Sequence, residues 1–485
     1  MVEYKVKSIK YNFIMNFILT VSNFLFPLLT FPYVSRVLQA EANGKVAFVS
    51  SIVSYFMMIG SLGIPTYGIR AVSRVRDNKK KLSIVVQELL IINLCLVAIV
   101  LSCYFVAILN VKTFYEYREL FYINAVGILL NVLGMNWFFQ AIEQYDYITI
   151  RSIVFRIISI ILLFTLIHNP SDYVLYTAIL VFSGVGSNIL NLKRIFKFVS
   201  FKKIDKYKFS RHFRPILVMF AQTLVVSIYT NLDTVMLGFI KGNFEVGLYN
   251  ASIKVKGLLL SVVTSLGNVL LPRMSYYVKN NMKDKFLIMM TKAINFTLLM
   301  AFPMSIFFVL CAKESILLLA GPEYLGAVLG MQFLVIAVIP NALTGVLGMQ
   351  VLIPLEKENF VLYSVIVGAI LDFVLNIIFI PLYGVSGASF STMIAEFIVL
   401  SVQIYYTRTY LLQIRNNILS IRYISATIIA SILILLLNNI EISNFLLFMI
   451  KGITFFGSYL LILFVKKEEL ILENLNFIIK KYRKK

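Results

Sequence analysis

The composition of the chain is that of an integral membrane protein. Its 485 residues are 60% hydrophobic and 14% charged, with a mean hydropathy of +0.87. Soluble proteins carry about 25% charged residues, so a soluble enzyme or a set of soluble domains is disfavoured. The 45 Lys and Arg residues outnumber the 23 Asp and Glu residues, for a formal net charge of +22. In a membrane protein such an excess indicates topology before it indicates nucleic-acid binding.

Long apolar stretches follow one another along the whole chain. A helix needs about 20 apolar residues to cross a bilayer core of about 30 Å. The stretches that meet this length predict fourteen spans, at about 11–34, 46–66, 83–108, 120–142, 152–168, 172–192, 215–240, 247–272, 287–312, 326–352, 359–381, 384–407, 421–438 and 443–465. The predicted fold class is therefore an all-α polytopic membrane protein. No small-residue cleavage site follows the first stretch, so we expect it to be a retained span and not a signal peptide.

Lys and Arg gather in alternate loops. The most basic connections share one predicted side of the membrane: 67–82, 193–214, 273–286, 408–420 and the tail from Lys466. Because basic loops stay in the cytoplasm, both termini are predicted to be cytoplasmic. The excess charge is thus explained by topology, and no nucleic-acid partner is expected.

No catalytic or metal-binding pattern is visible in the sequence. Cys95, Cys103 and Cys311 lie within apolar runs, and none belongs to a C-x-x-C motif. His168 and His212 are 44 residues apart and belong to no zinc motif. We therefore predict that the protein is not an enzyme and holds no cofactor and no metal.

The two halves of the chain echo one another. Gly44 and Arg70 recur, 203 residues later, as Gly247 and Arg273. The tetrapeptide Val-Leu-Gly-Met at 132–135 also recurs in the second half, and a Glu-bearing loop follows each copy. Parallel repeats of six spans are a transporter architecture.

These repeats predict three parts of the chain. An N-terminal six-helix bundle covers 1–210, a C-terminal six-helix bundle covers 211–415, and 416–485 add helices 13 and 14 with a basic cytoplasmic tail. In the first span, Pro27 and Pro32 remove backbone hydrogen bonds, so we expect a bent or broken helix that gives a gate its flexibility.

Ionisable residues within the spans are candidate functional residues, because burying a charge in the bilayer costs at least about 2.5–3.5 kcal/mol at the helix centre. Asp233 in span seven and Lys254 in span eight lie at matched depth, so an ion pair between them is feasible. The 203-residue offset places no charge at their counterparts in the first half, so the fold does not require them. Lys256, left unpaired, would then make a cavity cationic and suited to a phosphate or pyrophosphate.

Other charges within the spans have different expected roles. Asp372 and Glu396, near the middle of spans 11 and 12, are candidates for coupling to a proton or sodium gradient, or are neutral structural carboxyls. Glu88, Arg156 and Lys292 lie near span ends and are expected to reach the interface. For Lys451 in span 14 a structural and a functional role remain equally open.

Four segments resemble one known family. They are the run from Asn16 to Arg36 with its two prolines, "RVLQAEANGKVAF" after it, "WFFQAIEQYDYITIRSIVFRIISIILLF" across spans four and five, and "YTNLDTVMLG" in span seven. "GVSGASFSTMIAE" in span 12 also fits. The chain resembles the Wzx-type flippases for lipid-linked oligosaccharides, in the superfamily that includes multidrug extruders and peptidoglycan-precursor flippases.

The resemblance implies two six-helix bundles around a V-shaped cavity. It implies alternating access that moves an undecaprenyl-pyrophosphate-linked oligosaccharide across the membrane for capsule, exopolysaccharide or O-antigen synthesis, with the lipid tail in or near the bilayer. Glycosyltransferases and a polysaccharide polymerase are the expected partners. Asp233 matches the family's span-seven motif, whereas peptidoglycan-precursor relatives carry first-span charges that this chain lacks.

Three other functions compete with this interpretation. A cation-coupled multidrug extruder of the same superfamily is favoured by the acidic residues within the spans and disfavoured by the two lysines. A membrane enzyme, such as a polymerase or acyltransferase, would need a substantial external loop with acid, base or His residues. A scaffold that transports nothing would have no use for buried charges.

Overall fold

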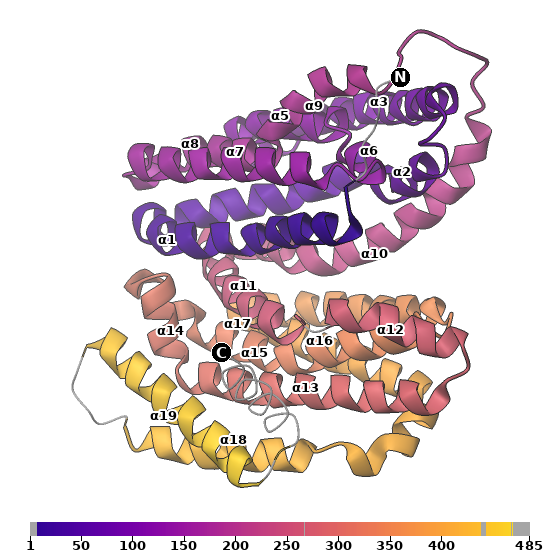
Figure 1. Cartoon of the computed structure of the whole chain (residues 1–485). Coiled ribbons are helices and arrows are strands. Elements are labelled where there is room, and N and C mark those ends of the chain that lie inside the picture. Colours follow the sequence, from indigo (N-terminus) through magenta and orange to yellow (C-terminus); the bar gives the residue numbers. More distant parts are fainter. Residues whose placement is uncertain (1–6, 266, 438–442, 467, 469–485) are drawn as a thin grey trace, which may run out of the picture. The chain divides into compact units, whose positions relative to one another are not determined.

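The structure is a computed structural model that describes residues 7–265, 267–437, 443–466 and 468. Every regular element in these ranges is a helix (Figure 1), which confirms the predicted fold class. Most of the predicted basic tail lies outside the described residues. So does the connection between predicted spans 13 and 14.

The chain forms two compact units, Met1–Gly247 and Leu248–Lys485. The last helix that lies wholly in the first unit, α10 (Ser210–Ile240), packs against α1 and α2. The boundary between the compact units therefore lies well after the predicted boundary at 210/211. The prediction followed the sequence repeat and not the packing. The helices Ser420–Leu435 and Asn444–Val465 fall within the second compact unit, and the division of the chain into three parts stays a prediction.

The first unit is built from long helices joined by short connections. Its elements are α1 (Ile9–Ser61), α2 (Ile64–Ser73), α3 (Lys79–Asn110), α4 (Lys112–Glu116), α5 (Arg118–Leu133), α6 (Asn136–Ala141), α7 (Tyr145–Leu166), η1 (Pro170–Asp172), α8 (Tyr173–Val185), η2 (Gly186–Asn188), α9 (Ile189–Arg194), η3 (Ile195–Lys197) and α10. One buried cluster of the core joins α2, α3 and α6 around Trp137 and Phe138.

The second unit repeats this plan and extends it. Its elements are α11 (Asn243–Val263, which begins just before the boundary), α12 (Gly267–Lys279), α13 (Lys283–Leu310), α14 (Ala312–Leu319), η4 (Pro322–Ala327), α15 (Val328–Ile336), α16 (Val338–Thr344), the π-helix η5 (Gly345–Leu352), α17 (Glu358–Ile414), η6 (Arg415–Asn417), α18 (Ser420–Leu435) and α19 (Asn444–Val465). The last two helices pack on α13 through a core that includes Phe307, Tyr423 and Phe455.

Eleven described helices are long and apolar enough to cross a membrane. Two of them, Tyr11–Ser73 with 63 residues and Glu358–Asn417 with 60, are about three times the length that one crossing needs. Each contains a residue of non-helical backbone, Gln39 or Gly384. The fourteen predicted stretches all fall on helical segments, with Ser420–Leu435 as a shorter apolar helix. The number of crossings itself stays a prediction.

The break in α1 does not lie at its prolines. Pro27 and Pro32 are both inside the helix, and the backbone leaves helical geometry at Gln39, with φ 64° and ψ 178°. Figure 1 shows α1 reversing direction on the left-hand side of the view. Proline fits here because its effect is confined to one missing hydrogen bond and a ring contact with the preceding turn, both of which a long helix can absorb.

Backbone geometry repeats along with the sequence. Gln39 has its counterpart 203 residues later in Gly242, where φ is again positive at 90°. Glu143 and Glu356, the acidic residues of the two Glu-bearing loops, have φ of 54° and 58°. Each ends a helix with the same pair of hydrogen bonds. Its own N–H donates to the carbonyl three residues earlier, and the N–H of the next residue donates to the carbonyl five residues before that residue. The predicted repeat is therefore present in the fold.

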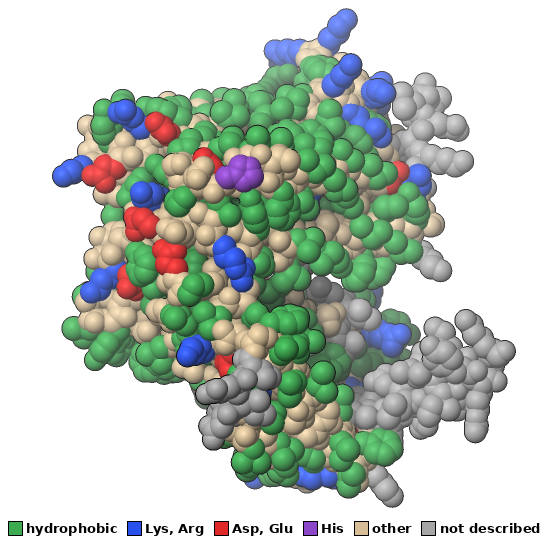
Figure 2. All heavy atoms as spheres, turned by 90° about the vertical axis from the view of Figure 1, so that its left-hand side faces the viewer, with side chains coloured by type: hydrophobic (Ala, Val, Ile, Leu, Met, Phe, Trp, Pro, Cys, Tyr) green, Lys and Arg blue, Asp and Glu red, His purple; other side chains and the backbone are tan. Residues whose placement is uncertain are grey.

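The surface shown in Figure 2 is the left-hand side of Figure 1. Acidic and basic side chains are interspersed there among hydrophobic ones. Many large hydrophobic side chains elsewhere on the helices are also exposed, such as Ile453 at 71% and Ile370 at 61%. Exposed apolar side chains on long helices are those that lipid would cover.

Candidate substrate and coupling residues

Three polar side chains meet within the helices of the second unit. Lys256 on α11 places its Nζ atom 3.1 Å from Oε1 of Glu396 on α17. Asn341 on α16 donates a hydrogen bond from Nδ2 to the same oxygen. The side chain of Glu396 is 3% exposed and that of Lys256 is 15% exposed. This Lys256–Glu396–Asn341 cluster is therefore a largely buried, charge-balanced group.

The pairing changes the expected role of both charged residues. Lys256 is not the unpaired lysine that the sequence suggested, since a carboxylate 140 positions away in the chain balances it. Glu396 is held by a cation and an amide, so it lies in a polar site and not alone in an apolar helix.

The other predicted residues are placed within their own units. Asp233 is buried on α10 in the first unit, at 5% exposure. Lys254 lies on α11 in the second unit, two residues before Lys256, and is intermediate in exposure. An ion pair between Asp233 and Lys254 would join different units, and it stays a prediction.

Asp372 sits deep in α17 at 1% exposure. Its Oδ2 atom accepts a hydrogen bond of 3.3 Å from Nδ2 of Asn376, one turn along the same helix. An Asp and an Asn on one helical face supply several oxygen atoms. Such oxygen ligands suit a proton or a hard cation.

Glu88 lies in a polar cluster that sequence reasoning missed. It was expected to reach the interface, but its side chain is fully buried. Its Oε1 atom accepts a 2.5 Å bond from the backbone N–H of Lys208, and its Oε2 atom lies 2.8 Å from Nε2 of His212. Arg211 pairs with the same carboxylate, and Tyr67 lies 2.8 Å from Nδ1 of the imidazole. The cluster ties α3 to the first turn of α10 and to Lys208 just before that helix.

Arg151, which lies just before the predicted span 152–168, forms a second polar cluster that sequence reasoning missed. It is 5% exposed. Its guanidinium donates to Ser187 at 2.9 Å and Asn188 at 3.0 Å, and also to Oδ1 of Asn136. The available signal was Asn136, Asn188 and Asn191, three asparagines within predicted apolar spans.

Two more charges within the spans have partners of their own. Arg156, expected to reach the interface, instead donates to Ser22 and Asn23 on α1. Lys451 on α19 lies 2.7 Å from Glu314 on α14, which favours its structural role. In the part of the chain that the structure describes, no group of three or more His, Cys, Asp and Glu residues could hold a metal ion.

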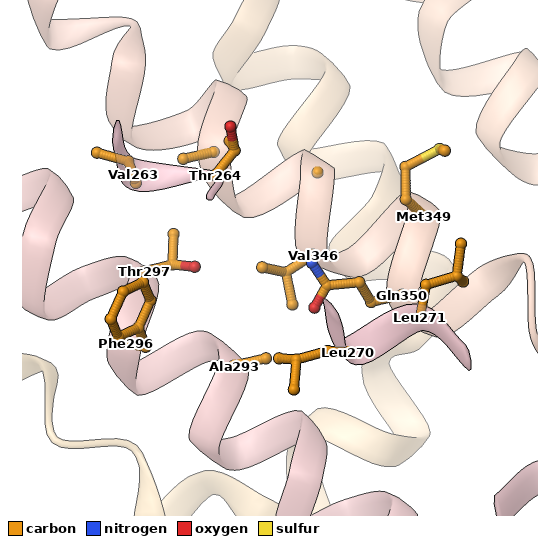
Figure 3. Close-up of a pocket in the computed structure, with 12 residues that line it drawn as sticks. Val263, Thr264, Leu270, Leu271, Ala293, Phe296, Thr297, Val346, Met349 and Gln350 are labelled. Atoms are coloured by element: carbon orange, nitrogen blue, oxygen red, sulfur yellow. The ribbon is translucent and has the colours of Figure 1, made fainter. Parts of the chain in front are cut away.

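One cavity of about 120 Å³ lies in the second unit (Figure 3). Its lining is mostly apolar, with the hydroxyl-bearing Thr264 and Thr297 and the amide of Gln350 among it. Part of the lining belongs to the π-helix η5, whose altered register is a feature often found at functional sites.

Comparison with known proteins places this fold in a family. A family model described as "Polysaccharide biosynthesis protein" matches residues 9–278. The "Putative O-antigen transporter" of Escherichia coli is 23% identical over 80% of this chain and 94% of its own length. The Shigella dysenteriae protein of the same name is 25% identical over 80% of this chain and 98% of its own.

Solved structures share the fold at low sequence identity. "Lipid II flippase MurJ, inward closed conformation" superposes with a TM-score of 0.73 at 14% identity, over 95% of this chain and all of that one. An inward-facing multidrug resistance MATE family transporter of the MOP superfamily superposes with a TM-score of 0.60 at 14% identity, over 81% and 95%. The family match covers more than half of the chain, and the protein is therefore a multi-pass membrane protein that belongs to the polysaccharide biosynthesis protein family.

Proposed function

We propose that the protein is a flippase that translocates a lipid-linked oligosaccharide across the cytoplasmic membrane. The observation that carries this proposal is the match over 80% of the chain to two proteins named as O-antigen transporters. The fold shared with a lipid II flippase supports it, because lipid II is itself a glycan on a lipid carrier. The substrate would be an undecaprenyl-pyrophosphate-linked repeat unit for capsule, exopolysaccharide or O-antigen.

The Lys256–Glu396–Asn341 cluster supplies a polar site for this transport. A buried ion pair that has lost one partner is strongly destabilised, so a pyrophosphate could replace Glu396 beside Lys256 only if Glu396 were protonated or bound a cation. Substrate binding and coupling to a proton or sodium gradient would thereby share one carboxylate. Lys254, two residues away on α11, adds positive charge near the same helix. Alternating access between the two units would move the bound head group.

The test is polysaccharide export in a bacterial strain that lacks its own flippase. The wild-type protein should restore surface polysaccharide, and the Lys254→Ala/Lys256→Ala double variant should not, at equal amounts in the membrane. Restoration by the double variant would remove the two lysines from the mechanism. Failure of the wild type with every lipid-linked glycan supplied would overturn the proposed function.

A variant that keeps the fold makes the test sharper. Lys256→Met leaves Glu396 charged and buried, so loss of export could reflect misfolding. Lys256→Met/Glu396→Gln removes both charges together and keeps an amide that Asn341 can bond. We expect this pair to fold and to remain unable to export.

A second candidate is a cation-coupled multidrug extruder. The MATE-like fold and the buried carboxylates of Asp372 and Glu396 favour it. The ion pair with Lys256 weakens it, because a balanced carboxylate attracts cationic drugs less. Ethidium accumulation in cells that lack their main extruders separates the two functions: a flippase should leave it unchanged.

A further inference from the structure

The two units treat the same polar site differently. In the first unit, Gly134 and Asn136 lie at the break between α5 and α6, where the guanidinium of Arg151 donates to Asn136 and Asn188. A Cβ atom at Gly134 would meet the side chain of Asn188 at 2.5 Å. Glycine therefore lets that amide approach the backbone closely.

The second unit has the same elements in the same order. Gly348 is the third residue of the repeated tetrapeptide and Gln350 is the residue after it, which are the positions of Gly134 and Asn136 in the first copy. A Cβ atom at Gly348 would meet the amide of Gln403 at 3.2 Å. We therefore match Gln403 in the second unit to Asn188 in the first. Each residue lies near the end of its repeat.

The donor is missing from the second unit. Ser364 follows Arg151 by 213 residues, which is also the offset between the loops of Glu143 and Glu356. Its hydroxyl donates to the carbonyl of Val361 at 2.7 Å and accepts from Nε2 of Gln403 at 3.0 Å. A serine cannot reach as far as a guanidinium and offers one donor where arginine offers five.

Two amide oxygens are left without a hydrogen-bond donor as a result. Among the described residues, neither Oε1 of Gln350 nor Oε1 of Gln403 has a hydrogen-bond partner, and both atoms are buried. Gln350 is 6% exposed and Gln403 is 2% exposed. An unsatisfied buried acceptor is unfavourable, so a ligand that donates a hydrogen bond to it removes that cost on binding.

Gln350 lines the cavity of about 120 Å³, and Figure 3 shows its amide directed into the space between Thr297, Val346 and Leu270. A single water needs about 10–15 Å³ of such volume, so a larger polar group fits. Met349 in the lining is 51% exposed, which gives the cavity an opening.

The lining selects the chemistry of the ligand. None of its twelve residues is charged, so nothing there would balance a pyrophosphate or a free cation. A lipid tail has no donor for the amide oxygen. A neutral sugar ring offers hydroxyl donors on its edge and an apolar face for Phe296 and Met349.

We propose that the Gln350 cavity binds one neutral sugar residue, with a sugar hydroxyl donating to Oε1 of Gln350. This inference rests on the proposed function for the source of the sugar, namely the glycan of the lipid-linked substrate. The cavity is then a specificity site, separate from the Lys256–Glu396–Asn341 cluster that would serve the charged head group.

The test is direct binding to the purified full-length protein in nanodiscs. Glucose, galactose and N-acetylglucosamine are the neutral probes, and glucuronic acid and pyrophosphate are the charged ones, measured by saturation-transfer NMR. At least one neutral sugar should bind the wild type in the millimolar range or tighter. Gln350→Met should weaken that sugar about tenfold, as expected for one lost hydrogen bond.

Two further variants keep the result interpretable. Gly345→Val should fill the cavity without a clash, because a Cβ atom at Gly345 meets nothing within 4 Å, and it should also abolish sugar binding. Gln413→Met should bind as the wild type does, because among the described contacts the amide of Gln413 donates only to the carbonyl of the exposed residue Thr409, one turn back along α17. The melting temperature of Gln350→Met should equal or exceed that of the wild type, since its amide oxygen stabilises nothing; a purely structural role would lower it.

Each outcome decides one claim. No neutral sugar binding to the wild type, or equal binding by Gln350→Met, would overturn the inference even if the protein restores polysaccharide export. Sugar binding that depends on Gln350, in a protein that exports no lipid-linked glycan, would instead overturn the proposed function.

Discussion

Lys256 and Glu396 lie 140 positions apart in the chain and meet at 3.1 Å. Depth along a helix identified both as unusual, because a charge within a span needs a partner or water. The depth of a residue does not show in which direction around the helix axis its side chain points. The sequence alone therefore could not show that α11 and α17 turn these two side chains toward each other. The partner first expected for a span-eight lysine was in the adjacent hairpin.

The ion pair predicts a pattern of stabilities. Lys256→Met leaves the Glu396 carboxylate buried without its cation and should lower the free energy of unfolding by about 3–5 kcal/mol. Lys256→Met/Glu396→Gln should recover most of that loss. Thermal unfolding in detergent, followed by far-UV circular dichroism, measures both. Equal stability of the single and double variants would contradict the pairing.

Arg151 shows the opposite limit of sequence reasoning. Its position near a predicted span end is typical of a topological charge, yet it is 5% exposed and donates to three side chains. The acceptors come from α6 and η2, which the sequence pattern placed in separate spans. Charge counting gives the side of the membrane for most basic residues, but it cannot distinguish a surface arginine from one that closes a polar cluster.

The helical segments were predicted roughly in place. The cause of the break in α1 was not, because proline was expected to break this helix and the break lies at Gln39, seven residues beyond Pro32. The backbone of Gln39, at φ 64° and ψ 178°, lies in a region that essentially only glycine adopts without strain. Its counterpart in the second repeat is indeed a glycine, Gly242.

The two reversals allow a matched exchange of residues. Gln39→Gly should raise the free energy of unfolding by about 1–3 kcal/mol, because it removes strain and an exposed side chain. Gly242→Gln should lower it, and by backbone strain alone, since a Cβ atom there meets nothing within 4 Å. Denaturant titration of the two variants should therefore move the midpoint in opposite directions, and a shift in the same direction would refute this account.

The segment before α10 is held by α3. Besides the Glu88 contacts, Gln87 donates from Nε2 to the carbonyl of Ser200 at 2.5 Å and accepts from the Tyr207 hydroxyl at 2.8 Å. Two adjacent residues of α3 thus fix the connection between the repeats, which composition alone would suggest to be a loose basic loop.

Glu88→Ala should free this connection. The Lys208 N–H, Arg211 and His212 would all lose their acceptor, so trypsin should cut at Lys202, Lys203 or Lys206 faster than in the wild type. Asp205→Ala is the matched control, because that carboxylate bonds only the adjacent N–H of Lys206 in the described contacts. Limited proteolysis with mass spectrometry measures the cleavage rates. An unchanged rate for Glu88→Ala would show that the Glu88 contacts do not hold this connection.

At the scale of the whole molecule, composition and periodicity predicted the all-helical fold and its internal repeat. Both properties follow from the bilayer, which forces backbone groups to bond within each helix and leaves apolar length as a readable signal. The boundary between compact units was not predictable in the same way, because α10 belongs by sequence to the second repeat and by packing to the first unit. Packing depends on side-chain contacts that a hydropathy pattern does not contain.

Orientation in the membrane can be tested in a variant without Cys95, Cys103 and Cys311. Single cysteines at the exposed positions Lys112 and Lys241 should react with a membrane-impermeant maleimide in intact cells. Cysteines at Lys80 and Lys206 should react only after permeabilisation, because their loops are rich in Lys and Arg and stay in the cytoplasm. The reverse pattern would invert the predicted topology.

The unequal polar sites of the two units also bear on how the chain tolerates mutation. Loss of Arg151 would take a donor from three acceptors at once, and Asn136 and Asn188 would keep only a bond from an asparagine amide. Few substitutions in the first copy of the site would therefore leave a stable fold. Loss of the Gln350 amide leaves no other polar group without a partner. The second copy can therefore change in sequence without loss of stability until a new ligand favours one residue. A duplicated architecture of this kind can keep one copy as a fixed framework while the other diverges with its cargo.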